Sequence, residues 1–110
     1  IQKARASYGQ IAKTLDVTLK VAIYYCHLPD CEKSRRICHW LNAAVDTAMM
    51  GELQKAFPDA IQPWPTLIKK VNKTAYEKIQ SLVHESIKQE HGNAITPPQW
   101  EDIHWAKANE

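Results

Sequence analysis

Apolar residues recur every three or four positions along most of this chain, which is the period of an amphipathic helix. The longest run predicts one helix from Ser34 to Phe57. Asp30 or Ser34 can cap its start, and Pro58 ends it. Gly51, inside this helix, either weakens the last turns or marks a close contact. The apolar positions of the run are Ile37, Trp40, Leu41, Ala44, Val45, Ala48, Met49, Leu53 and Phe57.

The second half of the chain shows the same helical period after a proline-rich connector. Residues 58–65 hold three prolines around Trp64, which excludes a helix interior or a central strand and leaves the tryptophan to fill a gap. A further helix is predicted to begin at Thr66, its N-cap, and to stop at Gly92. A short last helix begins at the Pro97-Pro98 pair, because proline lacks the amide hydrogen that a first helical turn leaves unpaired.

These elements predict an all-α fold, a single compact domain of four to five helices over residues 1–110. We expect a first helical half at 1–57, the connector at 58–65 and a second helical half at 66–110. No window alternates with period two for long enough to be a strand. With 45% hydrophobic and 24% charged residues, the composition excludes disordered and fibrous classes.

Residues 1–28 admit two interpretations, and the function depends on which is right. In the first interpretation they form one long helix that is apolar on most sides and deeply buried. One of its stripes consists of Ile1, Ala4, Tyr8, Ile11, Leu15, Leu19, Ala22 and Cys26. A second stripe consists of Val17, Val21, Tyr24 and Leu28.

In the second interpretation the segment breaks near Asp16. Ala12 supplies a small residue where a second helix would cross the first, and Thr18 can cap that second helix. The apolar residues on both sides of the turn are Ile11, Leu15, Val17, Val21 and Tyr25. With these features, residues 8–27 resemble a helix-turn-helix of the DNA-binding kind. The segment departs from that pattern at Asp16, where glycine is most frequent, and at Ala22, where valine or isoleucine is usual.

The resemblance implies binding of double-stranded DNA, with a recognition helix from Thr18 to His27 in the major groove. Thr18 and Lys20 would then bind bases or phosphates, and Leu19 would touch thymine methyl groups. Residues 1–36 contain seven basic and three acidic residues, whereas the whole chain has a net charge of only +2. The predicted DNA contacts are Lys13, Thr18, Leu19, Lys20, Tyr24, His27, Lys33, Arg35 and Arg36.

The alternative function is a protein–protein interaction module, such as an adaptor, an inhibitor or an assembly domain. The first helix is then structural, and the partner is another protein chain. That chain would meet either a groove between helices or the aromatic C-terminus, through Trp100, Ile103 and Trp105. A turn between Asp16 and Thr18 would favour DNA binding, whereas an uninterrupted helix there would favour this alternative.

Cysteines and histidines gather between residues 26 and 39 without a metal-binding pattern. Cys26, His27, Cys31, Cys38 and His39 include no CxxC pair, so we predict no metal site, with a zinc site or a Cys26–Cys31 disulfide as the alternatives. Three cysteines without a disulfide framework indicate an intracellular protein. The chain has no glycine-rich phosphate loop, no strand-embedded serine elbow and no paired carboxylate on a predicted cleft, so we expect no enzyme activity, no catalytic residue and no cofactor.

No run of about 18 apolar residues occurs, so no membrane partner is expected. The chain begins at Ile1 rather than methionine, as is expected of an excised fragment or a mature product.

Overall fold

In the computed structural model, which describes residues 5–92 and 94–108, four of the five α-helices begin at a polar side chain that accepts a backbone N–H. These caps are Ser7 for α1 (Tyr8–Leu19), Asp30 for α2 (Cys31–Cys38), Asp46 for α3 (Thr47–Ala56) and Asn72 for α4 (Lys73–His91). The last helix, α5 (Pro97–Ala108), begins at the predicted pair of prolines. A π-helical segment, η1 (Lys20–Tyr25), continues α1, and a 3-10 turn, η2 (Ile68–Lys70), precedes α4.

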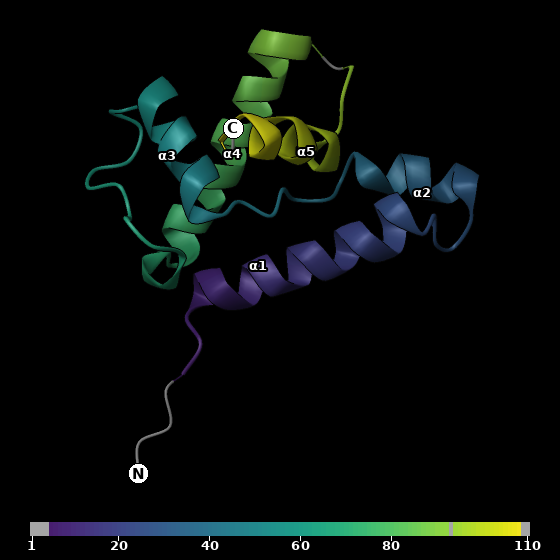
Figure 1. Ribbon diagram of the computed structural model, residues 1–110, viewed down its shortest axis with the longest axis horizontal. Coiled ribbons are helices and arrows are strands. Elements are labelled where there is room, and N and C mark those ends of the chain that lie inside the picture. The colour runs from purple at the N-terminus through teal and green to yellow at the C-terminus, as the bar shows by residue number, and fades with distance from the viewer. Residues whose placement is uncertain (1–4, 93, 109–110) are drawn as a thin grey trace.

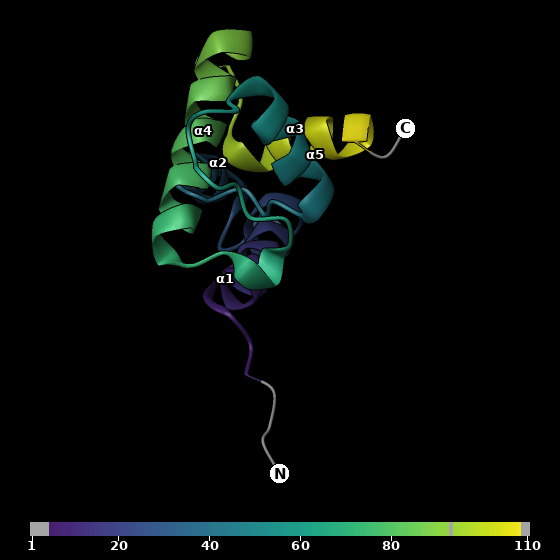
Figure 2. The same ribbon diagram turned by 90° about the vertical axis from the view of Figure 1, so that its left-hand side faces the viewer.

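The predicted all-α single domain is confirmed, and the described residues contain no strand. Helices α3, α4 and α5 group together, while α1 lies along one edge of the group and α2 folds back beside its far end (Figure 1). Seen from the side, α4 stands along one face of the domain and α1 lies below the group (Figure 2). None of the helices in the described ranges has the length and apolar character that a membrane span requires.

The helix predicted from Ser34 to Phe57 is wrong, because it is interrupted by a non-helical strap at residues 41–46. Most of the strap is buried, and side chains from distant helices bond to its backbone at Ala43 and Ala44. Gln80 on α4 accepts the N–H of Ala43 at 3.0 Å and donates to its carbonyl at 2.8 Å. Glu101 on α5 accepts the N–H of Ala44 at 3.3 Å. These bonds replace helical ones and satisfy the N–H and carbonyl of Ala43 and the N–H of Ala44 inside the domain.

The connector between α3 and α4 is longer than predicted. Helix α4 begins after Asn72 rather than at Thr66, because the Asn72 side chain accepts the N–H of Ala75 at 2.9 Å. Trp64 is buried as expected, and its Nε1 donates to the carbonyls of Phe57 and Pro58, both at 3.2 Å. The predicted stop at Gly92 is confirmed, since this residue follows α4 with a φ of 61°.

Residues 8–25 form one unbroken helix, as the first interpretation requires, and the break near Asp16 of the second interpretation does not occur. Thr18 does not cap a second helix. Its hydroxyl instead donates to the carbonyl of Thr14, one turn earlier, at 2.8 Å. No turn therefore separates Asp16 from Thr18 in the structure.

The hydrophobic core lies among α3, α4, α5 and the chain between α3 and α4, and no side chain of α1 belongs to it. The buried residues of α1 are Gly9, which has no side chain, and Asp16, which is charged, so neither adds a large apolar side chain to the core. The expectation of a deeply buried first helix is thus wrong for its described part, and Ile1 and Ala4 lie outside the described residues. Helix α1 rests on the body of the domain by a narrow strip, which leaves most of its apolar surface in solvent.

Candidate protein interface

Gly9 is the point at which α1 approaches the body most closely. Its N–H donates to the carbonyl of Val71 at 2.9 Å. A Cβ added to Gly9 would lie 2.7 Å from the Cβ of Val71 and would also collide with the backbone carbonyl of Ile68. Only glycine therefore allows α1 to dock against η2 at this distance.

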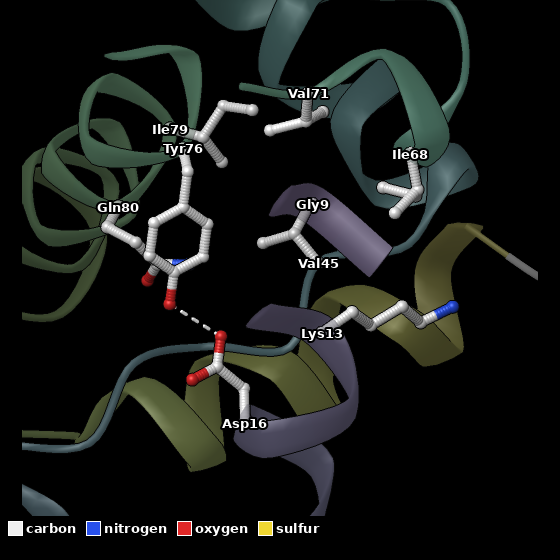
Figure 3. A pocket seen from close by; sticks show the side chains of 9 residues that line it. All are labelled: Gly9, Lys13, Asp16, Val45, Ile68, Val71, Tyr76, Ile79 and Gln80. Atoms are coloured by element: carbon white, nitrogen blue, oxygen red, sulfur yellow. Dashed lines mark hydrogen bonds between the residues drawn. The ribbon is translucent and has the colours of Figure 1, made fainter. Parts of the chain in front are cut away.

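Asp16 is the second anchor of α1, and it faces Tyr76 on α4 (Figure 3). The Tyr76 hydroxyl donates to Oδ2 of Asp16 at 2.6 Å and accepts from Nδ2 of Asn42 at 2.9 Å. Burial raises the pKa of Asp16 to about 6, although the hydrogen bond from Tyr76 acts in the opposite direction. The carboxylate thus carries a desolvation penalty when it is ionised.

The cavity beside Asp16 is too small for a substrate. It lies between α1, α4 and the strap, and Val45, Ile79 and Gln80 also line it (Figure 3). Its volume of about 20 Å³ is room for about one water molecule. This cavity is a feature of helix packing rather than a binding site.

Lys20, the third anchor, is turned inward and not toward a partner. Its side chain is buried, and its Nζ forms ion pairs with Asp102 and, at 3.3 Å, with Glu101 on α5. Burial lowers the pKa of Lys20, but the hydrogen bond to Asp102 and the charge of Glu101 outweigh it and hold the pKa above its usual value. The predicted role of Lys20 as a DNA contact is wrong, because its ammonium group already has two carboxylate partners inside the domain.

The opposite side of α1 and η1 exposes two rows of apolar side chains. Ile11, Leu15 and Leu19 follow one another at a spacing of four, and 57% of Leu15 is exposed. Val17 and Val21 form a second exposed row with the same spacing, whereas Tyr25 turns toward the body, where its hydroxyl donates to Oδ1 of Asp102 on α5 at 2.9 Å. Side chains four apart on a helix are neighbours on its surface, so each row is continuous. We call the five residues of these two rows the α1 face.

The α1 face carries no exposed charge between its two rows. The polar residues there are Thr14 and Thr18, and both hydroxyls are engaged by their own helix. The hydroxyl of Thr14 donates to the carbonyl of Gln10 at 3.0 Å, and that of Thr18 to the carbonyl of Thr14 at 2.8 Å. The charged residues of this helix segment are Lys13, which is half-buried, and the buried Asp16 and Lys20. The surface between the two rows is consequently apolar and neutral, and Lys13 lies at its edge, where it lines a surface hollow together with Val17 and Thr18.

The structure divides the nine predicted DNA contacts among different surfaces. Thr18 and Leu19 are exposed on α1, with Leu19 in the apolar face, while Lys13 lines the small cavity. Lys33 and Arg36 are exposed on α2, where they pair with Asp30 at 3.9 Å and Glu32 at 3.0 Å. Tyr24, His27 and Arg35 are brought together around a second cavity between η1, α2 and residues 94–99.

The aromatic C-terminus divides between the core and the surface. Trp100 is 1% exposed, and its Nε1 donates to the hydroxyl of Ser86 at 3.1 Å. Its predicted role as a partner contact is therefore wrong, because the side chain belongs to the core. Ile103 and Trp105 are exposed, as that prediction requires. Trp40, assigned by its spacing to the apolar stripe of a helix, is 82% exposed.

The cysteines provide no metal centre. Cys26, Cys31 and Cys38 are free thiols, of which the first two are exposed and the third is buried. Across residues 5–92 and 94–108, no group of three His, Cys, Asp or Glu side chains is placed to hold a metal ion.

The chemistry that the surface offers is an apolar helix face and a basic cavity. Comparisons of the chain with models of protein families, with curated proteins and with solved structures found no match.

Proposed function

We propose that this domain is a protein–protein assembly module, in which the α1 face of one copy packs against the α1 face of a second copy. The observation that carries the proposal is the unbroken helix of residues 8–25 with two exposed apolar rows. Folded monomers rarely expose a continuous apolar patch of this kind unless a partner covers it.

A second copy is the occupant that the chemistry of this face favours. Rows of side chains four apart form the ridges that pack into the grooves of another helix. Because the surface between the two rows is uncharged, the centres of two identical faces meet without like-charge repulsion. An interface between identical surfaces closes with twofold symmetry and leaves no apolar face open. The face runs from Ile11 to Val21, which gives a contact roughly 15 Å long at 1.5 Å per residue.

The expected affinity is moderate. Covering the exposed half of one Leu, Ile or Val side chain stabilises the pair by about 1 kcal/mol. Five such residues from each copy contribute about 10 kcal/mol before the cost of association, which is about 4–15 kcal/mol. With an association cost at the lower end of this range, about 4–6 kcal/mol of net stabilisation remains, so the dimer should dissociate on dilution from millimolar to tens of micromolar concentrations.

The test is sedimentation equilibrium of the domain between about 1 µM and about 1 mM. We expect a reversible monomer–dimer equilibrium for the unmodified chain, and a monomer throughout for Leu15→Glu. The matched control is Leu67→Glu, which places the same charge on a leucine that is 42% exposed and lies outside the α1 face. Circular dichroism of each variant reports that the helices are retained. A chain that stays monomeric at the highest concentration, or a Leu15→Glu variant that dimerises normally, would overturn the proposal.

Binding of double-stranded DNA stays a prediction with less physical support. The turn of the helix-turn-helix is missing, and Lys20 is engaged inside the domain. Fluorescence anisotropy of a labelled duplex at two salt concentrations tests it, since phosphate contacts weaken steeply with salt.

A further inference from the structure

The second cavity has the size of a small-molecule site. It measures about 290 Å³ and opens between η1, α2 and the segment that leads into α5. Sites for small ligands begin at roughly 300 Å³. Residues from three separate parts of the chain line it, so it exists only in the folded domain.

The cavity is lined by basic groups and by no carboxylate. Arg35 from α2 lines it together with His27, which follows η1, and His39, which ends α2. The neighbouring basic residues of α2, Lys33 and Arg36, have carboxylate partners on their own helix. Among the described residues Arg35 has no such partner. A guanidinium group without a carboxylate partner can donate its N–H groups to an anionic ligand.

A further donor and an apolar wall complete the cavity. Oε1 of Gln99 accepts from the N–H and the hydroxyl of Thr96, at 2.9 and 3.1 Å. These two bonds fix the orientation of the Gln99 amide, and its Nε2 makes no hydrogen bond within the described parts of the chain. The ring of Tyr24 and the side chain of Ile23 contribute apolar and aromatic surface.

We propose that this cavity binds a small organic phosphate. Arg35, His27 and His39 hold the phosphate group, Gln99 donates to it, and Tyr24 packs against a compact apolar or aromatic body. The proposal concerns a surface other than the α1 face, so it stands or falls independently of dimerisation.

The test is an NMR titration of the isotope-labelled domain with phenyl phosphate, which combines both expected chemical groups. We expect saturable shifts centred on Tyr24, Arg35, His39 and Gln99, with dissociation in or below the millimolar range. Arg35→Gln should weaken binding about tenfold, because it removes a charge-assisted hydrogen bond. Arg36→Gln is the matched control, since Arg36 is adjacent in sequence but does not line the cavity and pairs with Glu32. It should leave the affinity unchanged.

Two simpler probes separate the parts of the proposed ligand. Inorganic phosphate should bind the same residues more weakly, because it lacks the ring that packs on Tyr24. Benzyl alcohol should not bind, because it has no anionic group. Absence of saturable shifts with phenyl phosphate, equal affinity of the Arg35→Gln variant, or benzyl alcohol binding as tightly would overturn the assignment. Repeating the titration on Leu15→Glu removes any contribution from dimerisation.

Discussion

The hydroxyl of Tyr76 donates a hydrogen bond of 2.6 Å to the carboxylate of Asp16, joining two helices that are 60 residues apart in sequence. Asp16 is buried in this contact, and together with Gly9 and Lys20 it anchors α1 on the body of the domain. Because α1 contributes no side chain to the core, these anchors decide how firmly the helix is held. Substitutions at these anchors should therefore change the free energy of unfolding of the domain.

The stability of the domain should fall as the pH rises toward 6. Burial raises the pKa of Asp16 from 3.8 to about 6, so between these values the folded state binds more protons than the unfolded state. The free energy of unfolding therefore decreases as the pH rises through this window and levels off above it. Asp16→Asn, which removes the buried charge, should melt at a higher temperature than the unmodified chain at pH 8 and should lose this part of the pH dependence.

Thermal melts followed by circular dichroism from about pH 4 to pH 8 measure this effect. Asp59→Asn is the control, since it removes the same charge from an exposed position. An Asp16→Asn variant that melts below the unmodified chain at pH 8 would contradict the prediction.

Gly9→Ala should destabilise the domain by about 1–3 kcal/mol, although alanine is the better helix former. The added methyl group collides with Val71 and with the backbone of η2, so α1 must move away from the body. Urea denaturation measures the change in the free energy of unfolding. The control is Gly51→Ala in α3, where no heavy atom lies within 4 Å of the added Cβ. That substitution should stabilise the domain by about 0.5–1 kcal/mol, and the same sign for both variants would contradict the packing of α1.

Lys20→Met should cost about 1–3 kcal/mol of stability, because it leaves the buried carboxylate of Glu101 without its cation. Adding Glu101→Gln should recover part of this loss, since the amide still accepts the N–H of Ala44 and carries no charge. Denaturant titration of the two single variants and the double variant gives the coupling free energy between Lys20 and Glu101. Lys33→Met, which breaks an exposed pair, should change stability by less than about 0.5 kcal/mol. Additive effects at positions 20 and 101 would show that the pair is not coupled.

Trp100→Ala should destabilise the domain by about 3–5 kcal/mol, because it empties a core site and removes the hydrogen bond to Ser86. The exposed Trp40 supplies the comparison, and Trp40→Ala should change stability by less than about 0.5 kcal/mol. Differential scanning calorimetry of the two variants distinguishes them. A Trp100→Ala variant that melts like the unmodified chain would mean that this side chain is not part of the core.

Local signals in the sequence predicted the helical class and several helix ends. The cap at Asp30, the stop at Gly92 and the start at Pro97 depend on neighbouring residues alone, and the structure confirms them. The break in the long predicted helix could not be found in this way. Leu41 and Val45 keep the helical spacing, but the hydrogen bonds that hold the chain extended there come from Gln80 and Glu101.

The candidate interface illustrates a second limit of sequence patterns. Ile11, Leu15 and Leu19 have the spacing of a buried helix face, and the pattern is the same whether a core or a partner covers it. The buried Lys20 is a related case, because its partners lie on α5, far along the chain. Burial of a polar residue is decided by the groups that the fold brings to it.

The strap at residues 41–46 also sets an order of events in folding. Its amides at Ala43 and Ala44 find their acceptors 37 and 57 residues away, so the strap forms only when loops of that length have closed. Helices α2 and α3, by contrast, have caps and hydrogen bonds drawn from their own neighbourhoods. The domain thus joins locally capped helices through a central segment whose contacts are distant in sequence, and we expect closure of that segment to be the slow step of folding.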